Sequence, residues 1–241
     1  MKQFNLAFVV SGGGSCTPEW GGVTAVGADP VASQIGALRA IGGDVRISFG
    51  GQAGRELAIT CTDVTQLESA YQQVISAYDV NKLDFDIEGA AVDNTAANAR
   101  RDQAIAALQA KNPGLQVSFM LPVPPSGLTS DGDAVLTGAT RAGVKIAAVN
   151  VMAMGISDNA AWSKIAVTPM IGVNDTSDEI FTVANAKQLA TFAASKHLAW
   201  LSMWSAARDT QCSGGAQSFA SPTCSSIVQT PHEFMGALGA Y

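Results

Sequence analysis

The sequence predicts an α/β protein in which strands and helices alternate along the whole chain. Short apolar stretches typical of strands recur seven times, and amphipathic or alanine-rich stretches long enough for helices separate them. This alternation indicates parallel strands joined by helical crossovers, and the apolar character of the strands suits a sheet covered by helices. The 241 residues suffice for one domain with a sizeable core, so we expect a single domain over residues 1–241. The expected strands are residues 4–10, 44–50, 82–88, 115–121, 146–153, 164–170 and 199–205.

Local signals mark the expected helices between these strands. Asp29-Pro30 is an N-cap followed by proline at the first helical position, and Val31, Ile35 and Leu38 then form one apolar stripe. The later helical stretches show similar stripes or are rich in alanine. We expect further helices at residues 67–78, 94–111, 128–142, 183–196 and 231–240.

Composition and charge exclude several classes of partner. Hydrophobic residues make up 47% of the chain and charged residues 14%, with a net charge of −6. No basic run is present, so neither nucleic acid nor an anionic membrane surface is expected as a partner. The sequence has no run of eighteen apolar residues that would span a membrane. Residues 4–10 read as a strand without a cleavage region behind them, so no signal peptide is expected in this chain.

The four cysteines lack the spacing of metal ligands. Cys212 and Cys224 flank a loop rich in glycine and serine, which a disulfide would close, and Cys16 and Cys61 would then pair by elimination. Two disulfides would indicate an oxidising compartment and therefore a secreted, extracellular protein. The alternative is four buried free thiols.

The most informative stretch is the predicted strand at residues 82–88. Leu83, Phe85 and Ile87 alternate along it with three carboxylates, which places the acids on one face of the strand. Neighbouring acids on that face lie about 6.5–7 Å apart along the strand. Repulsion and burial then favour protonation of at least one, which makes a general acid beside a carboxylate. Exposure of this face to water, with the acids present by chance, is the alternative. The three acids are Asp84, Asp86 and Glu88.

These residues resemble the catalytic signature of family 18 glycoside hydrolases, the chitinases, which reads Asp-Gly-x-Asp-x-Asp-x-Glu on the fourth strand of a TIM barrel. The three acids match, whereas Asn81 and Lys82 replace the opening Asp-Gly. Residues 48–51, Ser-Phe-Gly-Gly, are similar to the Ser-x-Gly-Gly signature on the preceding strand. Segments 120–124, 150–154 and 203–206 extend the likeness over nearly the whole chain, closest to bacterial secreted chitinases. The resemblance implies a TIM (β/α) barrel and hydrolysis of chitin or chitooligosaccharides.

The resemblance also implies a role for each acid and requires no metal or cofactor. The N-acetyl oxygen of the substrate attacks the anomeric carbon, and an oxazolinium ion forms. Glu88 acts first as acid and then as base for water, while Asp86 holds the acetamido N–H and balances the cation. Asp84 tunes Asp86 from below.

The candidate substrate-binding residues lie mostly at strand ends, which converge around one opening in a TIM barrel. Trp204 has the position where the family places a tryptophan under the distorted sugar, with core packing as the alternative. Trp20, in a glycine-rich loop, is a second candidate sugar platform or a packing residue. The glycines allow close approach of substrate or only turn the chain. The candidates are Gly50, Gly51, Met120, Met152, Met154, Trp204 and Trp20.

Two interruptions indicate a shortened barrel of about seven strands. No βα unit precedes the strand at Phe4, and only residues 155–163 lie between Met154 and Lys164, too few for a regular crossover helix. The nearest relatives follow Met-Ala-Met with Asp-Tyr, whereas this chain has Gly155-Ile156. An incomplete barrel exposes two strand edges, at Phe4 and near Ser205, which invite a local insertion or self-association.

The sequence therefore predicts a retaining, substrate-assisted chitinase acting on β-1,4-linked N-acetylglucosamine polymers. Two other functions remain open. The first is a chitin-binding, lectin-like protein with little or no turnover, which the missing Asp-Tyr favours. The second is an endo-N-acetylglucosaminidase that acts on N-glycans.

Overall fold

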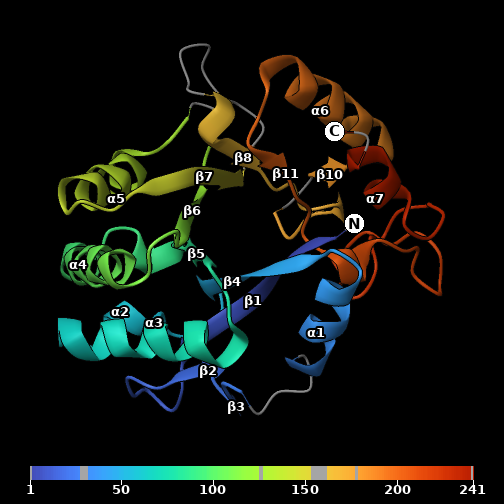
Figure 1. Cartoon of the computed structure of the whole chain (residues 1–241). Coiled ribbons are helices and arrows are strands. Elements are labelled where there is room, and N and C mark those ends of the chain that lie inside the picture. The colour runs from blue at the N-terminus through green and yellow to red at the C-terminus, as the bar shows by residue number, and fades with distance from the viewer. Residues whose placement is uncertain (1, 28–31, 125–126, 153–161, 177–178, 240) are drawn as a thin grey trace. The chain divides into compact units, whose positions relative to one another are not determined.

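The computed structural model describes residues 2–27, 32–124, 127–152, 162–176, 179–239 and 241 (Figure 1). It contains two compact units. The first comprises Met1–Pro122 and Leu128–Val149, and the second comprises Val123–Gly127 and Asn150–Tyr241. The sequence-based expectation of a single domain over residues 1–241 stays a prediction.

All seven predicted strands are present, and the fold class predicted from the sequence is confirmed. In the first unit, β1 pairs parallel with β4, β4 with β5, and β5 with β6. In the second unit, β11 pairs parallel with β8, and the Thr168 N–H donates to the Val151 carbonyl at the end of β7. The seven are β1 (Gln3–Ser11), β4 (Asp44–Gly50), β5 (Lys82–Asp86), β6 (Gln116–Pro122), β7 (Ile146–Met152), β8 (Ile165–Val167) and β11 (Trp200–Leu201).

The six predicted helices are also present. Side-chain caps explain several of their first residues: Asp63 accepts from the Gln66 N–H, and Asn94 accepts from the Ala97 N–H. The predicted N-cap at Asp29-Pro30 lies outside the described residues. The helices are α1 (Ala32–Ala40), α3 (Val64–Tyr78), α4 (Thr95–Lys111), α5 (Ser130–Arg141), α6 (Val183–Lys196) and α7 (Glu233–Leu238).

Several short elements have no counterpart in the sequence-based prediction. They span two to four residues each, which is too short for a periodic hydrophobic signal. They are β2 (Pro18–Trp20), β3 (Thr24–Ala25), α2 (Leu57–Thr60), β9 (Gly172–Val173), β10 (Ile180–Phe181) and the 3₁₀ turns η1 (Gly89–Ala91), η2 (Trp162–Lys164) and η3 (Ala206–Arg208).

The hairpin β2–β3 covers part of the edge of β1, the strand edge that the sequence predicts to be open. β2 pairs antiparallel with Val9–Ser11 of β1, opposite the side on which β1 pairs with β4. The local insertion considered from the sequence is therefore present at this end of β1. The missing first βα unit and self-association through an open edge stay predictions, and residues 155–161 of the short crossover lie outside the described residues.

Helices cover the strands of the first unit and bury an aromatic layer. α3 packs against α4, and α4 against α5 (Figure 1). The rings of Phe49, Tyr71, Phe85 and Phe119 are fully buried, with Phe49 and Phe85 stacked at 5.4 Å. Aromatic contacts of this kind add to the free energy gained from burying the ring surface.

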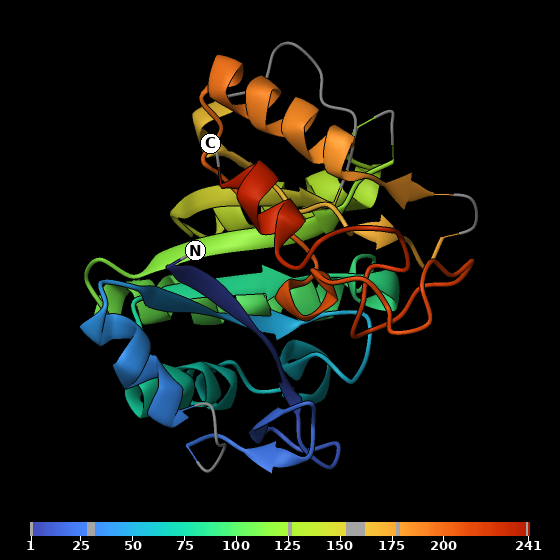
Figure 2. The ribbon, with the colours of Figure 1, turned by 90° about the vertical axis from the view of Figure 1, so that its right-hand side faces the viewer.

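The second unit has its own small core and a strongly anchored C-terminal segment. α6 and α7, orange and red in Figure 2, pack together around the buried Phe181 and Phe234. The buried guanidinium of Arg208 donates to the carbonyls of Ile171 and Val173, at 2.7 Å each, and to that of Ser221. These bonds hold segments distant in sequence, because each buried donor needs an acceptor.

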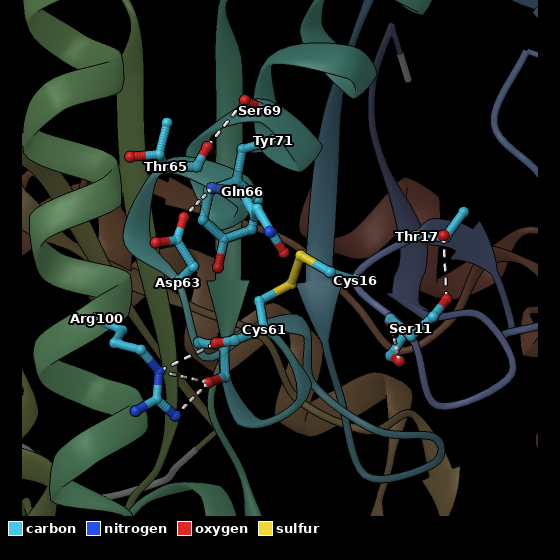
Figure 3. Close-up of a disulfide and its surroundings, with 12 residues drawn as sticks. Ser11, Cys16, Thr17, Cys61, Asp63, Thr65, Gln66, Ser69, Tyr71 and Arg100 are labelled. Atoms are coloured by element: carbon cyan, nitrogen blue, oxygen red, sulfur yellow. Dashed lines mark hydrogen bonds between the residues drawn. A yellow bond between two sulfur atoms is a disulfide. The ribbon is translucent and has the colours of Figure 1, made fainter.

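Both predicted disulfides are confirmed. Cys212 pairs with Cys224 in the second unit. Cys16 pairs with Cys61 in the first, where Figure 3 shows the bridge joining the segments that follow β1 and β4. In the described part of the chain, no helix is both long and apolar enough to cross a membrane.

A buried carboxyl between helices generates a prediction about pH and stability. Asp102 of α4 is 3% exposed, and a side chain added at Gly138 of α5 would lie 3.0 Å from its Oδ2. Burial raises the pKa of Asp102 from 3.8 to about 6, although the neighbouring Arg101 lowers it. The protonated form is favoured in the folded state, so this stabilisation is complete below pH 3.8 and is lost as the pH rises through about 6.

Asp102→Asn should therefore stabilise the protein at pH 8, by at most about 3 kcal/mol at 1.36 kcal/mol per pH unit. The gain should shrink toward zero near pH 4. Urea unfolding at both pH values measures it, with the exposed Asp93 replaced by Asn as the control. An equal effect of Asp102→Asn at both pH values would contradict the explanation.

Candidate active site

The acid strand has the alternation that the sequence predicts. Leu83, Phe85 and Ile87 are fully buried in the hydrophobic core. On the opposite face, Asp84 is 0% exposed and Asp86 2%, while Glu88 is half-buried. β5 ends at Asp86, but the Ile87 N–H donates to the Met120 carbonyl, and Glu88 keeps an extended backbone. The three carboxyls therefore follow one another along one face.

The register of the neighbouring strands places a matched residue on each side of the two buried acids. Ser48 of β4 and Ser118 of β6 are the register partners of Asp84. Gly50 and Met120 are the partners of Asp86 at the next level. Side chains at the same level of adjacent strands point to the same face of a sheet. The predicted site residues of the first unit other than Trp20 are thus brought together.

Two hydroxyl groups hold Asp84. The Ser48 Oγ donates to its Oδ2 at 2.8 Å and the Ser118 Oγ to its Oδ1 at 2.5 Å. The pKa of Asp84 is raised, because burial outweighs the two hydroxyls and the charge of Arg46, which lower it. No role for Ser48, Ser118 or Arg46 is predicted from the sequence. Arg46 and Ser48 lie two residues apart on the strand before the acids. This spacing places both on one face of that strand, so the sequence could have indicated them as partners of the acids.

Asp86 is in a different environment. Burial, the charges of Glu88 and Asp84, and a hydrogen bond with Glu88 all raise its pKa. Its Oδ1 is buried and has no hydrogen-bond partner among the described residues. Asp86 therefore favours the protonated form and shares a hydrogen bond with Glu88, while one of its oxygens remains available as an acceptor.

The glycine pair lies directly against the backbone of Asp86. The Gly51 N–H donates to the Asp86 carbonyl at 3.0 Å, and a Cβ at Gly50 would lie 2.1 Å from the same oxygen. Gly50 has φ +96° and Gly51 φ +83°, in the region that favours glycine. A Cβ at Gly51 would also lie 2.7 Å from the Phe8 ring. At these positions, close packing on the acid strand requires glycine.

The remaining predicted residues other than Trp20 belong to the second unit or lie outside the described residues. Trp204 belongs to the second unit, where the residue is 43% exposed and its backbone bonds to Pro169 and Ile171. Met152 ends β7 in that unit and is half-buried. Met154, like Gly155-Ile156, lies outside the described residues.

Trp20 is already engaged in packing. Its indole N–H donates to the Tyr78 hydroxyl at 2.6 Å, and the two rings meet edge to face with centroids 5.8 Å apart. Only its ring surface therefore remains for a sugar, and its role as a platform stays a prediction.

The part of the chain that the structure describes has no group of three or more His, Cys, Asp or Glu side chains that could hold a metal ion. The acid face of β5 carries two buried carboxyl groups whose pKa values are raised, Asp84 mainly by burial and Asp86 by burial together with the neighbouring acids. Such an arrangement is suited to general acid–base catalysis.

Comparison with known proteins agrees with this site. No family model matches the sequence. The chain is 34% identical to "Probable bifunctional chitinase/lysozyme" of Escherichia coli (strain K12) and 33% identical to "Endochitinase 11" of Metarhizium anisopliae. Each match covers 87% of this chain, but 28% of the first relative and 48% of the second, so the chain spans less than half of either protein.

A solved structure matches almost the whole chain. It is that of catalytic-site mutants of active domain 2 of the thermostable chitinase from Pyrococcus furiosus, complexed with chito-oligosaccharides. The TM-score is 0.89 at 27% identity, over 99% of this chain and 85% of that one. In sequence and in structure, this chain is therefore similar to the catalytic domains of chitinases, in agreement with the resemblance to family 18 glycoside hydrolases found in the sequence.

The close packing of Gly50 generates a prediction about the site. Gly50→Ala adds a methyl group 2.1 Å from the Asp86 carbonyl oxygen, so one of the two strands has to move. We expect a loss of about 2 kcal/mol or more in stability, as is usual for strain at a special backbone angle. Thermal unfolding measures it.

Gly36→Ala is the matched control, since a Cβ there meets nothing within 4 Å and Gly36 lies inside helix α1. It should leave stability unchanged or raise it slightly. Equal effects of the two substitutions would contradict the proposed packing.

Proposed function

We propose that this chain is a chitinase that hydrolyses β-1,4 links in N-acetylglucosamine polymers with retention of configuration. The observation that carries the proposal is the acid face of β5, on which two buried carboxyls lie below a half-buried third. The relatives named as chitinases support the substrate class.

Glu88 is the proposed proton donor. It is the outermost acid of its strand and partly reaches solvent, so a glycosidic oxygen can approach it. As the bond to the leaving sugar breaks, the Glu88 carboxyl gives its proton to that oxygen, and the substrate's N-acetyl oxygen bonds to the anomeric carbon. Water later attacks the same carbon as its bond to the N-acetyl oxygen breaks, and the water gives a proton to Glu88, which restores the enzyme and the acetamido group. Two displacements at one carbon retain its configuration.

Asp86 is proposed to hold the acetamido group. Its buried Oδ1, without a partner among the described residues, is an acceptor suited to the N–H of that group. Its hydrogen bond with Glu88 lets the two acids share a proton before the substrate arrives. Asp84, fixed by two serine hydroxyls, supplies a negative charge beneath Asp86 and helps to raise the pKa of Asp86.

Binding is proposed to involve residues near these acids and one exposed ring. Gly50, Gly51 and Met120 flank Asp86 on the neighbouring strands. The ring of Trp204, a residue that is 43% exposed, can stack on the apolar face of a pyranose, and Met152, Met154 and Trp20 are secondary candidates. The two disulfides support a secreted protein, because such bonds persist in oxidising compartments. Self-association through an open barrel edge remains part of the proposal.

Glu88→Gln tests the acid assignment. The amide keeps the shape of the side chain but cannot donate the proton, so turnover of chitotetraose should fall by about a hundredfold or more. Binding of the oligosaccharide, measured by calorimetry, should remain. Asp93→Asn, an exposed change on the same unit, serves as the control. Hydrolysis by Glu88→Gln at the parent rate would refute the assignment.

The substrate class needs a separate comparison. Chitotetraose and a high-mannose glycoprotein are incubated with the parent protein, and released sugars are identified by mass spectrometry. Cleavage of chitotetraose alone is the expected outcome. Release of the N-glycan would favour the endo-N-acetylglucosaminidase. Binding of chitotetraose without cleavage would favour a lectin-like protein, consistent with Gly155-Ile156 in place of Asp-Tyr.

A further inference from the structure

A buried ion pair that the proposed mechanism does not use lies in the first unit. Glu56 is 5% exposed and Arg101 0%. The Arg101 Nη2 lies 3.2 Å from the Glu56 Oε2, and its Nε lies 3.5 Å from Oε1. Removing two charges from water is costly, and well-packed apolar residues in place of a buried ion pair often give equal or greater stability. Stability alone is therefore a weak explanation for this pair.

Neighbouring side chains complete the hydrogen bonding of the pair. The Asn98 Oδ1 accepts from the Arg101 Nη1 at 2.8 Å, and the Tyr71 hydroxyl donates to the Glu56 Oε1 at 3.4 Å. Arg101 and Asn98 lie on α4, Tyr71 lies on α3, and Glu56 lies between β4 and α2. The ion pair therefore ties the segment that follows β4 to both helices.

The first connection to the acids runs through Gly50. A Cβ at this position would lie 3.6 Å from the Glu56 Cγ and 2.1 Å from the Asp86 carbonyl oxygen. Gly50 therefore lies close to both the Glu56 side chain and the backbone of Asp86. The Gly51 N–H adds a direct hydrogen bond to the same carbonyl. A displacement of Glu56 would therefore be passed to the backbone of Asp86 through Gly50 and Gly51.

The second connection runs through Tyr71. Its ring meets Phe49 edge to face, with centroids 4.9 Å apart, and Phe85 likewise at 5.2 Å. Phe49 immediately precedes Gly50, and Phe85 lies between the two buried acids. The hydroxyl that donates to Glu56 therefore belongs to a ring packed behind both strands of the site.

We propose that Glu56 and Arg101 are positioning residues that fix the geometry of Asp86 against Glu88, acting through Gly50 and Tyr71. The proposal rests on the proposed function, in which this acid pair transfers the proton and holds the acetamido group. The ion pair touches neither acid's carboxyl in the described contacts. Its effect is to limit how far β4 and β5 move relative to each other where the acids lie.

The adjacent arginine offers a matched control. Arg100 also holds the segment after β4, but through main-chain carbonyls: its Nε donates to Cys61 at 3.0 Å and its Nη2 to Ala58 at 2.9 Å (Figure 3). These bonds lie beside the disulfide rather than at Gly50. Arg100→Met should lower the melting temperature and leave turnover per folded molecule unchanged.

The test compares Glu56→Gln with Arg100→Met and the parent on chitotetraose. Activity is expressed per folded molecule, with the folded fraction taken from thermal unfolding. Glu56→Gln should lower kcat by about tenfold or more and change KM by less than about threefold, because misplacing catalytic groups affects the transition state more than binding. Arg101→Lys keeps the positive charge but loses the planar guanidinium, so its kcat should lie between those of the parent and Glu56→Gln. If Glu56→Gln does not fold, Arg101→Lys takes its place in the test.

A second readout does not depend on turnover. Carboxyl carbon NMR follows the titration of Asp86, which faces Asp84 and Glu88 on its own strand, with Arg46 on β4 beneath them among the described charged groups. Loosening Asp86 from Glu88 weakens the interactions that raise its pKa, so the midpoint should move to lower pH in Glu56→Gln but not in Arg100→Met. A midpoint equal to that of the parent would overturn the proposal, as would equal kcat values for the two variants.

The proposed function and the positioning role of Glu56 and Arg101 can be refuted separately. A parent that does not hydrolyse chitotetraose, combined with a displaced Asp86 midpoint in Glu56→Gln, would refute the proposed function and support the positioning role. A parent that hydrolyses chitotetraose, combined with an unchanged Asp86 midpoint in Glu56→Gln, would support the proposed function and refute the positioning role.

Discussion

Two carboxyl groups removed from water on a single strand constrain the rest of the first unit. Burying an ionised carboxylate is costly unless donors or a counter-charge compensate it. Asp84 receives two serine hydroxyls and the field of Arg46. Burial raises the pKa of both acids, but Asp86 lies close to Glu88, whose charge and hydrogen bond raise its pKa further. Neighbouring acids of the same chemical type are thereby given different properties, which acid–base chemistry at one site requires.

The acids could be predicted from the sequence, but their partners could not. The alternation along residues 82–88 places three acids on one face whatever surrounds them. The contact of Ser118 with Asp84 depends on the register between β5 and β6, whose paired residues are 34 positions apart. Glu56 and Arg101 gave even less signal, because charged residues before and within a helix are usually exposed.

The fold shows the same division between local and long-range information. The long strands and helices follow from periodic patterns and caps such as Asp63 and Asn94. The hairpin β2–β3 spans too few residues for such a pattern, although it pairs with the end of β1. Trp20 was considered a sugar platform because of its glycine-rich loop, yet the hydroxyl that its indole contacts belongs to Tyr78 on a distant helix. Sequence distance conceals contacts of this kind.

The aromatic layer separates two polar networks in the first unit. On one face of β4 and β5 lie Asp84 and Asp86, and behind the opposite face lies the Glu56–Arg101 pair. Between them, Phe49 and Phe85 stack, and neither ring carries a hydrogen-bonding group. The contacts that link the two networks are packing contacts at Gly50 and at the Tyr71 ring, which can carry mechanical coupling. Close-packed interiors transmit small displacements because few voids absorb them. The stiffness of this layer therefore limits how accurately the acid pair is held.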